Sequence, residues 1–337
     1  MKTRLALGLL FVGFAGLEIY FRLIRGKQAW PTPQRAFQQL PQTHHNIFRN
    51  IDDEHEAYRI YRHTQDKELL ALRHALDPRQ WEESVVIKPH VIPPEGARLI
   101  WDVFGPFYNC PSKERVGTPP MAWDGGKWVC GVQALRHKPK CTVYSFGSNG
   151  EVTFEQQLLS LTHSNCKVHV FDYSLDKVRA NKVRAVKGAT LHEYGIGKED
   201  IQMNTPIKYG DHGVDQYELK SLPSIMTELG HSWIDLFKMD VEGGEYDILP
   251  ALVTHYKALK QKVPITQAQI EYHHSLDGPP MDKLVDTLKM MEASGFRTFS
   301  TEYNINGAPW NFIEYSYLHT DDFGNVVSDD VSNIETA

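Results

Sequence analysis

Between residues 141 and 320 the chain alternates short apolar runs with longer stretches in which apolar side chains recur every three or four positions. The first pattern is typical of buried strands and the second of amphipathic helices. We therefore expect strands at 141–146, 167–171, 190–194, 234–239 and 265–272, and helices at 154–161, 175–186, 221–228, 245–259 and 281–293. The stretch that runs through 211–213 is interpreted as an irregular loop.

Strands that alternate with helices pair in parallel through right-handed crossovers. The last two predicted strands, 296–300 and 312–318, follow one another without a helix, which indicates an antiparallel hairpin at one edge. The predicted fold class is α/β, with a mostly parallel seven-stranded sheet in a main domain at residues 140–320. Residues 321–337 are interpreted as a C-terminal tail.

The N-terminal part follows a different pattern. Residues 5–21 are apolar except for Glu18 and have cationic side chains on both flanks. The run is close to the ~20 residues that a membrane-spanning helix needs. We interpret residues 1–27 as an uncleaved signal anchor in the endoplasmic reticulum or Golgi membrane, with the bulk of the chain in the lumen. A cleaved signal peptide, and hence secretion, is the alternative.

Residues 28–66 are rich in Gln, Pro and charge and predict a stem or linker. Residues 67–139 form an N-terminal extension rich in Trp and Pro, which includes Trp81, Trp101, Trp123 and Trp128. These side chains either line a groove for a sugar or peptide or pack the extension onto the main domain. The run DGGKWVC at 124–130 predicts a turn that enters a short strand.

Composition narrows the possible partners. The 337 residues are 41% hydrophobic and 23% charged, so a large core is expected and general disorder is excluded. The formal net charge is −6 and the basic residues form no block beyond the N-terminal segment. A nucleic-acid partner is therefore not expected.

Polar residues and glycines stand where the predicted parallel strands end, which is where ligands bind in open α/β sheets. A glycine turn at 147–150 follows the first strand, and an acid, Asp172, ends the second one 25 residues later, a spacing that suits a ribose diol. The turn lacks the GxGxxG spacing that seats a pyrophosphate, which disfavours NAD and FAD and favours S-adenosylmethionine. The predicted cofactor-binding residues are Gly147, Ser148, Asn149, Asp172, Tyr173, Gly195, Ile196 and Asp240.

The chain from about residue 141 to 319 resembles class I S-adenosylmethionine-dependent methyltransferases. Its run IDLFKMDVEGGEYDIL at 234–249 resembles the signature DLLKIDVEGAEWEVL of FkbM-type enzymes. The runs DGGKWVC at 124–130, VYSFG at 143–147 and VHVFD at 168–172 resemble eukaryotic methyltransferase-like proteins with an N-terminal signal or anchor. The resemblance implies a Rossmann-like fold, cofactor contacts from Gly147, Asn149 and Asp172, and Ile196 near the adenine.

Two positions depart from the family pattern. Ser145 stands where the family usually has an acid, and Glu151 stands where it has a further glycine. These departures motivate an alternative hypothesis, in which the chain is a non-catalytic module that binds a partner through the Trp-rich extension.

Three residues are predicted to be catalytic. Asp240 and Glu242 belong to the run DVEGG at 240–244, and His273 follows the fifth strand. Asp240 and His273 would position the acceptor and remove its proton. Alternatively, Asp240 orients the cofactor's amino group and His273 is a core residue. A divalent metal held by Asp240, Glu242 and His273 would activate a hydroxyl, but no spacing requires it, so we expect none.

The leading hypothesis is S-adenosylmethionine-dependent O-methylation of a glycan or another acceptor of the secretory pathway, the acceptor class that the FkbM resemblance implies. Besides the non-catalytic module, a less favoured alternative is an NAD-dependent oxidoreductase.

Cys141 and Cys166 begin the runs CTVYSFG at 141–147 and CKVHVFD at 166–172, which contain the first two predicted strands. Each cysteine stands six positions before the residue that ends its run. In this fold class those strands are neighbours, so the two thiols would lie at the same level and bond to each other. Cys110 and Cys130 would then close a loop rich in Pro and Gly. The alternative is that all four cysteines are reduced, as in a cytosolic domain.

Overall fold

The computed structural model describes residues 104–106, 108–110, 112–118, 125–204, 207–209, 212–214, 216–273, 281–304, 312–321 and 326–329. All of them belong to the compact unit that spans Arg62–Ala337. The predicted signal anchor at 1–27, the stem at 28–66, and Trp81, Trp101 and Trp123 lie outside the described residues. Among the residues that are described, no helix is long and apolar enough to cross a membrane.

Seven strands form the central sheet, in the order β13-β14-β12-β11-β3-β4-β5. They are β3 (Thr142–Phe146), β4 (Lys167–Phe171), β5 (Ala189–His192), β11 (Ile234–Met239), β12 (Ile265–His273), β13 (Phe296–Tyr303) and β14 (Phe312–His319). The first five pair in parallel, and β14 is antiparallel to both β12 and β13. The predicted fold class, with its antiparallel edge hairpin, is confirmed.

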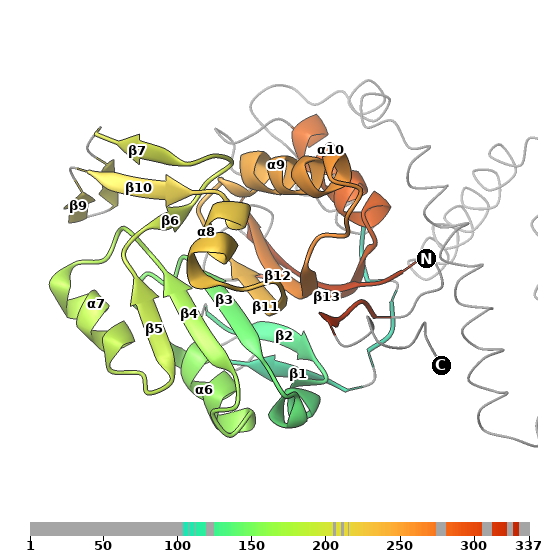
Figure 1. Cartoon of the computed structure of the whole chain (residues 1–337), viewed down its shortest axis with the longest axis horizontal. Coiled ribbons are helices and arrows are strands. Elements are labelled where there is room, and N and C mark those ends of the chain that lie inside the picture. The colour runs from blue at the N-terminus through green and yellow to red at the C-terminus, as the bar shows by residue number, and fades with distance from the viewer. Residues whose placement is uncertain are drawn as a thin grey trace, which may run out of the picture. The chain divides into compact units, whose positions relative to one another are not determined.

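Helices cover both faces of this sheet (Figure 1). They are α6 (Thr153–Leu161), α7 (Lys177–Arg184), α8 (Leu222–Leu229), α9 (Glu245–Ala258) and α10 (Met281–Ala293). One core contains α8, α9 and α10 with Tyr144, Phe146 and Phe237, and the other contains α6 and α7 with Val143 and Val168. Successive residues of β3 thus serve opposite cores, because side chains alternate across a strand.

The segment predicted as an irregular loop contains strands, and that prediction was wrong. β6 (Gly195–Ile196), β7 (Ile201–Met203) and β10 (Tyr217–Lys220) form a small sheet in the order β6-β10-β7, and β8 (Ile207–Tyr209) pairs with β9 (His212–Val214). These strands are two to four residues long, too short for a clear hydrophobic period. Their pairing depends on contacts between segments that are distant in sequence, such as β6 with β10.

The extension contributes a hairpin, β1 (Lys113–Val116) with β2 (Lys127–Cys130), followed by a 3₁₀ helix, η3 (Val132–His137). Val116 and Val129 are buried in the same core as α6. Trp128 packs with Phe299 and Leu318, and its indole Nε1 donates to Glu302 Oε2 at 2.5 Å. For Trp128, the structure therefore supports packing of the extension onto the sheet rather than a ligand groove.

Both predicted disulfides are present. Cys141 bonds to Cys166 and Cys110 bonds to Cys130, with Cα atoms 4.4 Å and 5.9 Å apart. Thr142 pairs with Lys167 immediately after the first disulfide, so the strand register used to predict that bridge is correct.

Candidate active site

A cavity of about 730 Å³ opens at the carboxyl ends of β3, β4, β11 and β12. Every residue that the sequence analysis placed in the site lines it, although each residue's role stays a prediction. They are Gly147, Ser148, Asn149, Asp172, Tyr173, Gly195, Ile196, Asp240, Glu242 and His273.

The glycine turn after β3 requires glycine at its first position. Gly147 has φ 71°, and a Cβ there would lie 1.7 Å from the backbone oxygen of Asp240. The next strand end, at Asp172, holds this turn in place. Its Oδ2 accepts from the backbone N of Ser148 at 3.0 Å and of Asn149 at 2.7 Å. Its Oδ1 accepts from the backbone N and Oγ of Ser174 at 2.9 and 2.7 Å.

Both Asp172 oxygens thus already accept hydrogen bonds from the protein. A ribose bound here would share these oxygens with the turn rather than meet an unengaged carboxylate.

The predicted adenine end of the cavity has a flat, apolar wall. Tyr173 stacks on Tyr217, with ring centroids 4.5 Å apart and planes 16° apart. A Cβ on Gly195 would come within 2.7 Å of the Tyr173 ring, so this glycine allows β6 to lie against the stack. Ile196 is buried beside it. Such a surface can pack against the face of a purine ring.

The two departures from the family pattern have structural partners. Ser145 Oγ donates to Oε1 of Glu155 on α6 at 2.6 Å, and Glu155 is buried and lines the cavity. Burial raises the pKa of Glu155, whereas nearby Lys238 and the Ser145 hydroxyl lower it. Glu151 accepts at the start of α6 from the backbone N of Thr153 at 3.0 Å and from its hydroxyl at 2.9 Å.

An acid therefore stands beside position 145, although it comes from the following helix. The sequence analysis missed Glu155. The available signal was an acid next to Phe154 on a helix face that is otherwise apolar.

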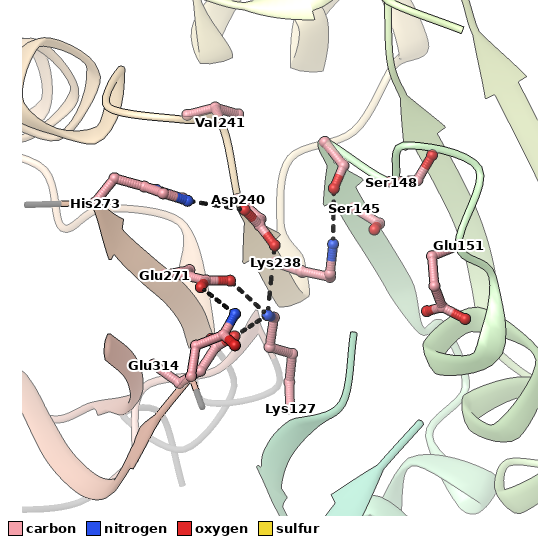
Figure 2. Close-up of polar contacts among 12 residues, drawn as sticks. Lys127, Ser145, Ser148, Glu151, Lys238, Asp240, Val241, Glu271, His273 and Glu314 are labelled. Carbon is pink, nitrogen blue, oxygen red and sulfur yellow. Dashed lines mark hydrogen bonds and ion pairs between the residues drawn. The ribbon is translucent and has the colours of Figure 1, made fainter. Parts of the chain in front are cut away.

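A buried lysine organises the opposite end of the cavity (Figure 2). Lys127 of β2 is 1% exposed, and its Nζ lies 3.5 Å from Asp240 Oδ2 and 3.3 Å from Glu271 Oε2. It also forms a short ion pair with Glu314 of β14. Asn304 Nδ2 donates to the other Glu271 oxygen at 2.9 Å. The hairpin of the extension thus supplies a cation to the edge of the site.

A second lysine lies within β11. Lys238 is buried, and its Nζ donates to the backbone oxygen of Gly147 at 3.0 Å. It thereby joins β11 to the glycine turn. The sequence analysis did not single out either lysine, and the signal for Lys238 was a charge inside an apolar strand run.

His273 lies among three carboxylates at this edge. Its Nδ1 lies 3.0 Å from Oε1 of the fully buried Glu245 on α9. Since a carboxylate accepts, Nδ1 is the donor. Its Nε2 lies 3.6 Å from Asp240 Oδ1 and 3.5 Å from Glu242 Oε2.

The surroundings of His273 and Asp240 shift their pKa values. Burial alone would lower the pKa of His273, but the hydrogen bond to Glu245 and the charges of Glu245, Asp240 and Glu271 raise it to about 9. Burial raises the pKa of Asp240, although Lys127 opposes this. Both shifts are typical of groups gathered at a functional site.

At this end of the cavity, carboxyl groups outnumber cationic groups. Five carboxylates, Asp240, Glu242, Glu245, Glu271 and Glu314, lie around two ammonium groups, Lys127 and Lys238. Burial, together with the charges of neighbouring acids, raises the pKa of three of these carboxyl groups, Asp240, Glu242 and Glu314. The arrangement suits a cationic ligand.

Residues 47–319 match the model of a family described as a methyltransferase domain. The chain belongs to this family. The match begins at residue 47, so the family's domain includes residues 47–66 of the predicted stem and all of the N-terminal extension as well as the sheet. The predicted family and enzyme class are thereby confirmed, and S-adenosylmethionine is the expected cofactor of that class.

Individual relatives are more distant. The chain is similar to the probable methyltransferase-like protein 24 of Rattus norvegicus, with 28% identity over 154 residues, which are 42% of this chain and 39% of that protein. It thus spans well under half the length of this curated relative.

Among solved structures, methyltransferase FkbM of Methylobacillus flagellatus aligns over 53% of this chain and 44% of its own, with 14% identity and a TM-score of 0.37. Fibrillarin of Aeropyrum pernix, solved with natively bound S-adenosylmethionine, aligns over 64% and 86%, with 8% identity and a TM-score of 0.31.

Proposed function

We propose that this protein transfers the methyl group of S-adenosylmethionine to a hydroxyl oxygen of a glycan or another acceptor in the secretory pathway. The main observation that supports the proposal is that a single cavity contains both the predicted cofactor-binding residues and the predicted catalytic residues. This cavity joins the glycine turn and Asp172 at one end to Asp240 and His273 at the other.

The residues divide into two groups along this cavity. Asp172, the glycine turn and the wall of Ile196 and Tyr173 would hold the nucleoside, and Ser145 with Glu155 would face the amino acid part. The cofactor would supply an electrophilic methyl group on a sulfonium. The remaining end, at Asp240, would receive the acceptor.

Asp240 and His273 would act on the acceptor by holding its hydroxyl in line with the methyl group. Alignment of the reacting atoms is the main contribution that an enzyme makes to such a displacement. The negative charge of this end also complements the positive charge of a sulfonium.

The hypothesis of a non-catalytic module was motivated by Ser145 and Glu151. The carboxyl group of Glu155 lies beside Ser145, where the family usually has an acid. Glu151 accepts a hydrogen bond from the backbone at the start of α6. Neither departure therefore requires a loss of activity.

The secretory location is supported by the disulfides Cys110–Cys130 and Cys141–Cys166. Such bonds persist in oxidising compartments and are rare in the cytosol. Protease protection in intact microsomes tests the location: a lumenal domain is digested only after detergent is added, and digestion without detergent would refute it.

Calorimetry with S-adenosylmethionine, S-adenosylhomocysteine and NAD tests the cofactor. Binding of the first two and not of NAD is expected, and the reverse would identify an oxidoreductase. Release of S-adenosylhomocysteine is then measured with panels of glycans and glycolipids for the wild type, for Asp240→Asn and for the control Glu193→Gln. Glu193 ion-pairs with Arg184 and is not among the residues that line the cavity.

We expect Asp240→Asn to lower turnover at least tenfold and Glu193→Gln to leave it unchanged. Cofactor binding without turnover on any acceptor would favour the non-catalytic module.

A further inference from the structure

Asp240 belongs to two groups of side chains that bring ligand atoms close together. One group is Asp240 with Glu271 and Glu314, and the other is Asp240 with Glu242 and His273. In each group, all three atoms lie within 4.8 Å of one another. The two groups differ in what lies between their members.

The first group already surrounds a cation. The ammonium of Lys127 lies between its three carboxylates, which it neutralises in part (Figure 2). A metal ion there would have to displace a lysine that is buried and paired, at a cost of several kcal/mol. We therefore assign no metal to this group.

In the second group, His273 approaches Oδ1 of Asp240, whereas Lys127 approaches Oδ2 (Figure 2). The atoms of this group are Asp240 Oδ1, Glu242 Oε2 and His273 Nε2, with separations from the nitrogen of 3.6 and 3.5 Å. These separations are longer than a usual N–H···O hydrogen bond of about 2.9 Å. They match the edges of a coordination sphere, because two bonds of ~2.1 Å at a tetrahedral angle place their ends ~3.4 Å apart.

His273 is held as metal-binding histidines are held. Its Nδ1 donates to Glu245, a fully buried carboxylate that also accepts from the backbone N of Val241 at 3.2 Å. A carboxylate behind the imidazole fixes the ring and leaves Nε2 as the ligand atom. Glu245 Oε2 is buried, and no hydrogen-bond donor among the described residues contacts it.

Access and charge favour the same site. Asp240 and His273 line the cavity, and the Glu242 side chain is 68% exposed, so an ion can enter from the open side. The excess of carboxylates over cations described above would be reduced by a divalent ion.

We propose that Asp240, Glu242 and His273 form a binding site for a divalent cation at the acceptor end of the cavity. One imidazole and two carboxylates suit Mn²⁺ or Zn²⁺, whereas Mg²⁺ prefers oxygen ligands alone. The ion would lie where the acceptor hydroxyl is expected and would orient and polarise it. Binding of the ion does not depend on the proposed function, but this role in methyl transfer rests on it.

The test uses the purified full chain after treatment with a chelator. Mn²⁺ alone is added, without cofactor or acceptor, and binding is followed by loss of the free-ion signal in electron paramagnetic resonance and by calorimetry. We expect one ion for each chain. His273→Ala should abolish binding, and Glu242→Gln should weaken it at least tenfold.

The control for Glu242→Gln is Glu193→Gln, which removes the same charge from an exposed pair with Arg184. Because Glu242 is exposed, its variant is expected to fold, and thermal melts verify this. Glu245→Gln, a positioning variant, should weaken Mn²⁺ ten- to hundredfold without removing a ligand.

No stoichiometric binding, or equal affinities in Glu242→Gln and Glu193→Gln, would overturn the site. If Mn²⁺ binds but the chelated enzyme turns over at the full rate, the role in the reaction is overturned while methyl transfer stands. If the ion binds and no acceptor is methylated, the proposed function fails and the metal site stands.

Discussion

Replacement of Lys127 by methionine should be among the most destabilising single changes in the described part of the chain. The variant keeps most of the side-chain volume and removes the charge, so its effect isolates the ion pairs. At 3.3 and 3.5 Å, the contacts with Glu271 and Asp240 are each worth about 5 kcal/mol at an effective dielectric constant of ~20. The desolvation of the buried ions offsets most of this gain.

The net cost follows from what the substitution leaves behind. Two buried carboxylates, Glu271 and Glu314, and the half-buried Asp240 lose their common cation, and removal of one partner from such a cluster typically costs ~3–5 kcal/mol. Lys113→Met is the matched control, since Lys113 lies on the same hairpin and is exposed. Its Nζ lies 3.5 Å from Ser300 Oγ and 5.1 Å from the centre of the Trp128 ring, so this change should cost about 1 kcal/mol or less.

The assay is equilibrium unfolding in urea at neutral pH with the disulfides intact. In a double-mutant cycle, Glu314→Gln should lower the cost of Lys127→Met by ~1 kcal/mol or more, because one uncompensated charge disappears. A cost of Lys127→Met below ~1 kcal/mol, or no coupling with Glu314→Gln, would refute the view that charge compensation by Lys127 stabilises this edge.

Three further predictions concern other parts of the domain. Asp172→Ala should weaken S-adenosylmethionine binding at least tenfold, because the glycine turn loses its acceptor; calorimetry measures this, and unchanged affinity would contradict it. Burial lowers the pKa of His319 to about 4, so its contribution to stability is complete above pH 6.5 and is lost as the pH falls toward 4. The loss should reach ~3 kcal/mol in denaturant titrations and should shrink in His319→Asn; equal pH slopes would count against the assignment. The double variant Cys141→Ala with Cys166→Ala should lose ~3 kcal/mol of unfolding free energy, and a change below ~1 kcal/mol would mean that the bridge constrains the unfolded chain little.

The sequence by itself determined the main sheet, the position of the cavity and the cysteine pairing. The five parallel strands and their helices follow from hydrophobic patterns that are local in the chain. The ends of parallel strands meet at one edge of a sheet, so residues as distant as Gly147 and His273 can be assigned to one site without coordinates. The register of two adjacent strands then brings Cys141 to Cys166.

Only the tertiary structure decided how the charges of the site are paired. Lys127 and Glu314 are separated by 187 residues, and the local sequence around either residue does not indicate that the two form an ion pair. Likewise, the acid beside Ser145 comes from α6, and Glu245 rather than a solvent molecule orients His273. The hydrophobic pattern of a segment reflects only which of its own positions face the core, so it can be read locally. A buried charge, in contrast, needs a partner of opposite charge because its desolvation is costly. That partner is set by which side chains the closed fold brings within a few ångströms, and a one-dimensional pattern does not contain this information.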